Sequence, residues 1–156
     1  MKLLTTPQRT TLTQIALRAW KKLHGSGAIE ESFNDWRKRI ASKACGYTIS
    51  EAPIEAFDDL FIRFKSEGGE MDEAFERAKS RVTNAQRNDI HNIKAKLAEV
   101  GWTLGYALKI ASVQWEEKLN LLIESLEQLP AVGTRNLLKT VTNRVNAEKL
   151  KRAARA

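Results

Sequence analysis

The chain of 156 residues contains one cysteine, three prolines and no long apolar run. Because Cys45 is the only cysteine, no internal disulfide can form, and the chain is compatible with a reducing compartment. No apolar stretch approaches the roughly 20 residues that a membrane-spanning helix needs. Polar residues directly follow Leu4 and leave no apolar segment for a signal peptide. We therefore expect a cytoplasmic protein without a membrane partner.

The chain also lacks the motifs of common enzyme and metal sites. It has no glycine-rich phosphate-binding loop, no dinucleotide-binding fingerprint and no nucleophile elbow. His24 and His91 are isolated from each other and from Cys45, so no spacing indicates a metal site, and a Cys–His nucleophile is a remote alternative. Neighbouring carboxylates such as Asp58-Asp59 diverge on a helix and do not form an acid–base pair. We expect no catalytic residue, no metal and no cofactor, and thus a protein that is not an enzyme.

Apolar residues recur at helical spacing along most of the chain, whereas no alternating strand pattern of convincing length is present. The first part predicts helices over residues 7–23 and 28–45, a third from about Pro53 to the Gly68-Gly69 pair, and a fourth over 70–80. The second part predicts a helix over 84–100 that stops at Gly101. The helix that follows Thr103 either continues to Leu129 or restarts near Ser112. A last helix begins near residue 134, and its basic tail, 149–156, is expected to fray.

Two segments of the chain open with the same pattern, T-x-x-Q-R. Thr5 and Gln8 begin the first expected helix, and Thr83 and Gln86 begin the fifth. A threonine three residues before a glutamine is the spacing of a capping box, in which each side chain binds a backbone N–H at the helix start. We expect an all-α fold, a compact bundle of about seven helices in a single domain over 1–156, with two similar halves over 5–82 and 83–148.

The formal charge of +7 arises from larger blocks of opposite sign. Residues 51–76 hold nine acids and two bases, residues 77–109 hold seven bases and two acids, and residues 130–156 hold seven bases and one acid. Charged helix faces are often merely solvated. Several basic helices in one small domain favour a surface that contacts phosphates, because Lys and Arg gain affinity there by counterion release.

The basic side chains of the fifth and last helices are the candidate nucleic-acid-binding residues. We expect phosphate contacts from Arg87, Lys94, Lys96, Arg135, Lys139, Arg144, Lys149, Lys151 and Arg152. Arg9 and Arg18 on the first helix are second choices. If these bases share one face, binding to nucleic acid is favoured. If they scatter and the third helix exposes a patch of phenylalanines, a protein partner is favoured.

Residues 83–110 are a candidate helix-turn-helix. Gly101 occupies the turn, Thr103 can cap the second helix, and that helix would then enter the major groove. Gly105 and the few base-reading side chains, among them Tyr106, speak against this interpretation, and a plain helical hairpin fits the same residues. Trp36 and Trp115 lie on apolar stripes and are expected in the core, while Trp20 and Trp102 are less constrained and could stack on bases.

Two runs of the sequence carry a resemblance to a known family. One is the Thr83–Arg87 opening with its turn at Val100-Gly101, and the other is the earlier run Trp36-Arg37, Gly46, Ser50 and Phe57–Leu60. In these runs the chain resembles the GemA-like regulatory proteins of Mu-like transposable phages. The resemblance implies a small phage or prophage protein in the cytoplasm of a bacterial host cell that modulates host DNA topology or gene expression, and it supplies no functional residues.

Together, these patterns predict a non-enzymatic regulatory protein that binds nucleic acid, most readily duplex DNA, through phosphate contacts, and acts in transcription regulation. The alternative is a protein-interaction module, such as a phage-encoded inhibitor or adaptor of a host protein, that uses an acidic or apolar helix face. A structural subunit of a larger nucleoprotein assembly is a third and weaker alternative.

Overall fold

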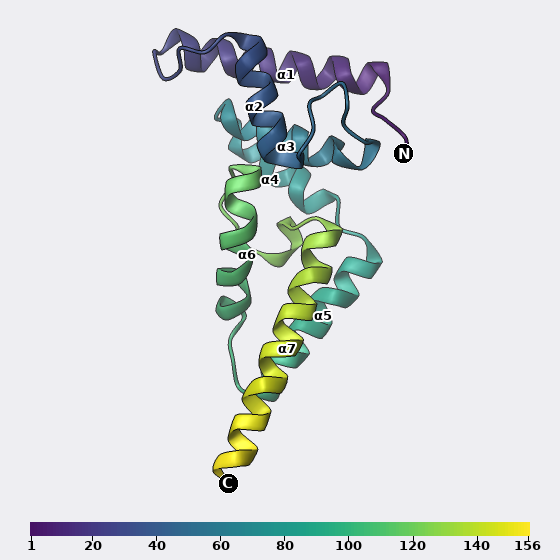
Figure 1. Cartoon of the computed structure of the whole chain (residues 1–156), viewed down its shortest axis with the longest axis vertical. Coiled ribbons are helices and arrows are strands. Elements are labelled where there is room, and N and C mark those ends of the chain that lie inside the picture. The colour runs from purple at the N-terminus through teal and green to yellow at the C-terminus, as the bar shows by residue number, and fades with distance from the viewer. The chain divides into compact units, whose positions relative to one another are not determined.

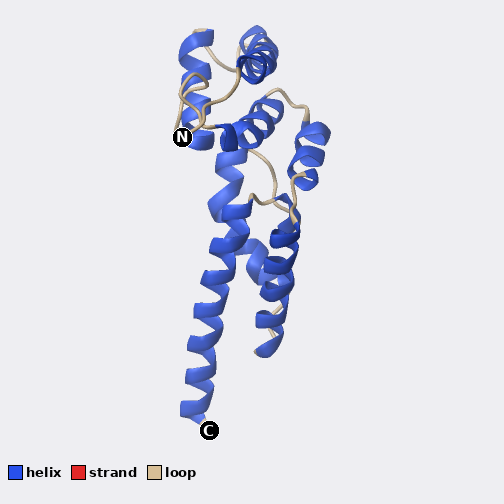
Figure 2. Ribbon diagram, turned by 90° about the vertical axis from the view of Figure 1, so that its right-hand side faces the viewer, coloured by secondary structure: helices blue, strands red, loops and turns tan.

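The computed structural model describes residues 1–156 and contains helices and loops but no strand (Figures 1 and 2). Its elements are, in chain order, α1 Thr6–Gly25, α2 Phe33–Cys45, the 3₁₀ turn η1 Ile54–Ala56, α3 Phe57–Glu67, α4 Met71–Ser80, α5 Asn84–Glu99, α6 Leu104–Leu119, η2 Leu126–Gln128 and α7 Ala131–Arg155. The expected all-α fold of about seven helices is confirmed. None of the helices combines the length and the apolar character that crossing a membrane requires.

The chain divides into two compact units. Unit 1 comprises Met1–Ala78 and Glu117–Leu121, and unit 2 comprises Lys79–Glu116 and Leu122–Ala156. The halves expected from the sequence meet between residues 82 and 83, whereas the first boundary between unit 1 and unit 2 lies between residues 78 and 79. The last residues of α6 also belong to unit 1, because the chain returns there after α5.

Unit 1 is built on α1, α2 and α3. Thr5 caps α1 with the expected capping box, since its side chain accepts from Gln8 N and the Gln8 side chain accepts from Thr5 N. The side chains of Leu12, Trp36 and Phe64 are almost completely buried in the core of this unit. The apolar stripes read from the sequence thus pack against one another as expected.

Helix α3 is buried on more sides than its apolar stripe predicts. Arg63 and Lys65 are each 6% exposed, although both are charged. The Arg63 guanidinium donates to the Glu117 and Lys118 carbonyls at the end of α6 and forms an ion pair with Glu67 at 2.8 Å. Arg63 therefore satisfies carbonyl groups that the helix itself leaves without partners.

Unit 2 is organised by α5 and α7, which lie side by side (Figure 1). The buried stripe of α5 includes Ile93 and Leu97, and that of α7 includes Leu137, Val141 and Val145. The part of α6 in this unit adds other buried side chains, namely Ala107, Ala111 and Trp115. Trp115 packs against α7 so closely that a Cβ on Gly133 would stand 3.0 Å from its ring.

The region between α6 and α7 shows whether the helix that follows Thr103 continues to Leu129. Helix α6 ends at Leu119, and Asn120 follows with a left-handed φ of 51°. The fully buried Gln128 then organises the loop, accepting from the backbone N–H groups of Glu124 and Ser125 and donating to the Leu122 carbonyl. Residues 103–129 therefore do not form one helix.

Helix α7 begins at Ala131, directly after Pro130, rather than near residue 134. It continues to Arg155, although the sequence leads us to expect a frayed tail from residue 149. The residues of this last segment are exposed, and Lys149 and Arg152 connect it to the end of α5.

Candidate nucleic-acid interface

The two units differ completely in net charge. Unit 2 holds thirteen Lys and Arg residues and six Asp and Glu residues, which gives +7. Unit 1 holds thirteen of each kind, which gives zero. The whole net positive charge of the chain therefore belongs to unit 2, which also contains all nine candidate phosphate-binding residues.

The start of α5 is fixed by contacts that extend beyond a capping box. Thr83 accepts from Gln86 N, and the Gln86 side chain accepts from Thr83 N at 3.1 Å. Gln86 is only 2% exposed, and its amide also donates to the Leu129 carbonyl at 3.0 Å, just before α7. This bond ties the first turn of α5 to the segment that leads into α7, so the two basic helices keep a fixed register.

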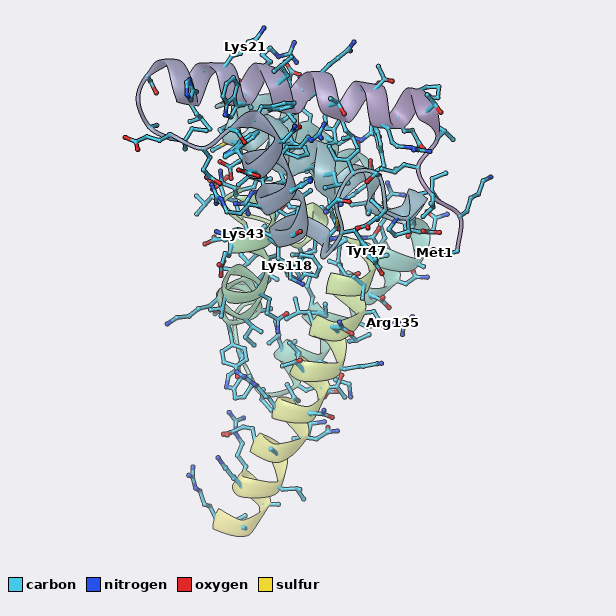
Figure 3. The ribbon with its side chains drawn as sticks, turned by 45° about the horizontal axis from the view of Figure 1, so that its top comes forward. Met1, Lys21, Lys43, Tyr47, Lys118 and Arg135 are labelled. Atoms are coloured by element: carbon cyan, nitrogen blue, oxygen red, sulfur yellow. The ribbon has the colours of Figure 1, made fainter.

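Three ion pairs line one side of the contact between α5 and α7. Arg135 of α7 lies 3.4 Å from the nearly buried carboxylate of Asp89, and Figure 3 shows its side chain extending from the helix. Lys149 of α7 lies 2.8 Å from Glu99, whose carboxylate is also 3.6 Å from Lys96. The hydrogen bond from Lys149 is the main reason that the pKa of Glu99 is lowered. This group of five residues is the α5–α7 seam.

Two further candidates hold parts of unit 2 together. Arg152 is paired with Glu148 and donates to the Val100 carbonyl at 2.9 Å, where α5 ends. Arg144 donates to the Tyr106 hydroxyl at 3.0 Å and lies over the Tyr106 ring. Both guanidinium groups keep other N–H donors, because each carries five.

The remaining four candidates, Arg87, Lys94, Lys139 and Lys151, are exposed and have no ion pair. These four residues do not all lie on the same face of the helices as the α5–α7 seam. Lys94 and Lys96 are two positions apart, so their side chains point about 160° apart around α5. Arg87 lies on the side of Lys94, because seven residues make nearly two turns. The structure therefore brings Lys96 and Lys149 together at Glu99. It places Arg135 about four turns away along α7, beside Asp89, and spreads the other candidates around unit 2.

The second-choice residues lie in unit 1. Arg18 is 3.6 Å from Glu70, and Arg9 donates to the Leu4 carbonyl at 3.1 Å beside a small pocket described below. The expected nucleic-acid contacts did not include Arg37 or Lys38, which line the same pocket. No sequence signal singled these two out, because their convergence with Arg9 depends on how α1 packs on α2.

The helix-turn-helix candidate consists of α5, the turn Val100–Thr103 and α6. Gly101 has the left-handed φ of 73° that the turn requires. Ala107 is buried, as a second helix that packs on the first one needs. Tyr106 is engaged by Arg144 and by the Trp102 ring, whose centroid is 4.6 Å away. Thr103 remains exposed as a side chain that could face a base.

The tryptophans expected in the core or as stacking residues, and the single cysteine, are buried or make contacts within the protein. Trp36 and Trp115 are buried, as their apolar stripes predict. Trp20 stacks on His24 and donates to the Glu31 carbonyl. Burial raises the pKa of the Cys45 thiol, which lowers the fraction of reactive thiolate. No group of three or more His, Cys, Asp or Glu residues is placed to hold a metal ion.

The phenylalanines of α3 do not form an exposed patch. Phe57 and Phe61 are half-buried, and the Arg77 guanidinium lies over both rings at 5.4 and 5.1 Å. The acidic groups nearby are also in contact with cations, since Arg77 is 2.7 Å from Asp58 and Lys65 is paired with Glu70 and Glu73. The acidic segment is thus partly neutralised within unit 1.

No protein family, curated protein or solved structure was found to match the chain.

Proposed function

We propose that the protein is a non-enzymatic regulator that binds nucleic acid, most readily duplex DNA, through the basic surface of unit 2. The observation that carries this proposal is the concentration of the entire +7 charge in that unit. A surface with such an excess of cations attracts polyanions and gains affinity by releasing the counterions that surround phosphates.

The exposed and unpaired cations would make the first contacts. Lys94, Lys139 and Lys151 can reach phosphates without losing an existing ion pair. Lys96 and Lys149 of the seam can follow, because an exposed ion pair contributes only about 0–1 kcal/mol to stability and exchanges readily. Binding of this kind does not read sequence, so any target preference would need base contacts such as those of a helix-turn-helix.

The resemblance to GemA-like proteins supports the biological setting of this proposal. A small basic protein of phage or prophage origin that binds DNA in a bacterial cytoplasm would be suited to modulate host DNA topology or transcription. The proposal does not need a catalytic group, a metal or a cofactor.

The test compares two triple variants that lose the same charge. The test variant carries Lys94→Gln, Lys139→Gln and Lys151→Gln in unit 2. The control carries Lys2→Gln, Lys21→Gln and Lys43→Gln, three exposed lysines of unit 1, two of which are labelled in Figure 3. Neither set includes a residue with an ion pair, so both variants should keep the fold, as circular dichroism can verify.

Binding to a random-sequence duplex is followed by fluorescence anisotropy at several salt concentrations. If each lysine contacts one phosphate, the slope of log K against log salt should fall by up to about 2.7 in the unit 2 variant, at about 0.9 per contact. The control should keep the wild-type slope. Equal losses in both variants, or no binding by the wild type at low salt, would contradict the proposal.

A protein partner is the second candidate function, and exposed apolar side chains of unit 2 favour it. Val113 is 81% exposed and borders a pocket of about 310 Å³ between α6 and α7, which Ile110 and Tyr106 also line. An inhibitor or adaptor of a host protein could use this apolar surface. Val113→Ser, which changes no charge, should then abolish capture of the partner from a bacterial lysate while leaving DNA binding intact.

A further inference from the structure

A small pocket in unit 1 lies between α1, α2 and the turn at residues 48–50. Its volume is about 150 Å³, and it is lined by Arg9, Thr13, Arg37, Lys38, Thr48, Ile49 and Ser50. Ligand pockets for drug-sized molecules measure roughly 300–1,000 Å³, so this one suits a small group or one end of a larger molecule. Three segments that are distant in the sequence meet here, and each brings polar side chains.

The lining of the pocket is strongly positive, although unit 1 as a whole is neutral. Arg9, Arg37 and Lys38 face the pocket, and no acidic residue lines it. None of these three cations has an ion pair. Three cations around one small pocket repel one another, and an anion between them would relieve this repulsion.

The hydrogen-bonding groups of the pocket are mostly donors with capacity to spare. Arg9 donates through Nε to the Leu4 carbonyl at 3.1 Å, and Arg37 donates through Nη2 to Asn34 at 3.1 Å. Each guanidinium therefore keeps several of its five N–H groups. The hydroxyl groups of Thr48 and Ser50 are hydrogen-bonded to each other at 3.1 Å at the turn, and each has one proton that can rotate towards a bound anion.

We propose that this pocket binds a phosphate group. The planar fork of a guanidinium matches two oxygens of a phosphate, a lysine adds a point charge, and hydroxyl groups complete the set. The small volume fits a phosphate group rather than a whole nucleotide. The phosphate could belong to a small molecule or to a nucleic-acid backbone, since both present the same oxygens.

One acidic side chain stands close to the pocket without lining it. Glu51 accepts a hydrogen bond from Thr48 at 3.1 Å. Its negative charge opposes a bound phosphate and draws the Thr48 hydroxyl away from the pocket. Removing this charge should therefore strengthen phosphate binding, an effect that a purely structural role of these residues would not produce.

The proposal concerns unit 1 and does not depend on DNA binding by unit 2. Backbone amide signals of the full chain, recorded by ¹⁵N NMR, report on each unit separately. Inorganic phosphate is titrated against sodium chloride of equal ionic strength, and a short duplex is titrated in a second experiment. Shifts at Arg9, Arg37 and Ser50 with inorganic phosphate indicate a small-molecule site, and shifts there with the duplex alone indicate a backbone-phosphate site.

Matched variants distinguish a specific pocket from general attraction. Arg37→Gln with Lys38→Gln should weaken binding about tenfold or more, because two charge-assisted hydrogen-bonding partners are lost. Lys21→Gln with Lys43→Gln removes the same charge outside the pocket and should leave the affinity unchanged. Glu51→Gln should strengthen binding about two- to fivefold, in the range of an exposed charge interaction.

The proposal is overturned if neither phosphate nor the duplex shifts the pocket amides beyond the chloride control. Equal weakening by the two double variants would also overturn it, since attraction would then be unspecific. Should the pocket double variant fold poorly, the Glu51→Gln variant decides, and an unchanged or weaker affinity rejects the pocket. Loss of duplex shifts in unit 2 alone would count against the proposed function and not against this site.

Discussion

The two T-x-x-Q-R openings allow one stability prediction to be worked out in detail, because their glutamines have identical local roles and different surroundings. Gln8 makes its hydrogen bonds only with Thr5, at an exposed site. Gln86 is buried and binds both Thr83 N and the Leu129 carbonyl. Replacement of each glutamine by alanine removes the same capping group, but only Gln86→Ala also removes a bond between distant segments.

The expected loss of stability follows from these contacts. In Gln8→Ala, water replaces the exposed capping bond, and the free energy of unfolding should fall by no more than about 0.5–1 kcal/mol. In Gln86→Ala, the Leu129 carbonyl stays buried without its partner, which costs about 1–3 kcal/mol in addition. The total for Gln86→Ala is therefore about 1.5–4 kcal/mol. At about 2–4 °C per kcal/mol for a chain of this size, the Tm should fall by roughly 3–16 °C.

Thermal and urea unfolding followed by circular dichroism measure these losses. Hydrogen exchange of peptides from α1 and α5 assigns each loss to its unit. Gln86→Ala should accelerate exchange in α5 and leave α1 unchanged. Equal losses for the two variants, or a larger loss for Gln8→Ala, would refute the view that the Leu129 contact fixes α5 against the start of α7.

Two other expected outcomes concern packing and pH. Gly133→Ala places a Cβ 3.0 Å from the Trp115 ring, so the free energy of unfolding should fall by about 1–3 kcal/mol and tryptophan fluorescence should change. Gly105→Ala has room for its Cβ and should stabilise α6 by about 0.4–1 kcal/mol. The hydrogen bond from Lys149 is the chief reason that the pKa of Glu99 is lowered from its ordinary value of 4.5. The contribution of Glu99 to the free energy of unfolding is therefore present above that pH and is lost as the pH falls through the folded-state pKa. Unfolding measured against pH should show a smaller acid-induced loss for Glu99→Gln than for the wild type, and identical profiles would contradict this.

Local signals explain why much of the fold could be predicted. Both capping boxes form as their spacing indicates, because a cap depends on residues within one helical turn. The buried stripes of α5 and α7 follow the 3.6-residue period, and Gly101 adopts the left-handed conformation that ends α5. These features need no knowledge of distant segments.

The features that sequence reasoning missed depend on distant partners. Helix α6 ends at Leu119 without a proline or glycine, and the loop that follows is held by the buried Gln128. Arg63 is buried because it meets the carbonyls of Glu117 and Lys118, more than fifty positions away. No periodicity in the sequence can announce such contacts.

The candidate site also combines features that are visible locally in the sequence with contacts that depend on distant segments. The excess of bases in α5 and α7 is visible in the sequence, but the pairs Asp89–Arg135 and Glu99–Lys149 join residues on different helices. Sequence reasoning therefore identified the basic helices without separating paired from unpaired cations. It could not find the pocket of unit 1, where Arg37 joins residues of α1 and of the turn at 48–50.

The position and pairing of a cation matter more for binding than the charge total. Arg63 and Lys65 are cations, but both are buried and paired, so neither can attract a polyanion. Lys139 and Lys151 carry the same charge and are exposed without ion pairs, so both remain available. Unit 1 and unit 2 contain equal numbers of basic residues, and the difference between them is the number of acids that neutralise these bases. A variant that adds acids to unit 2 should therefore weaken DNA binding as effectively as one that removes lysines, because an added carboxylate repels phosphates as a lysine attracts them.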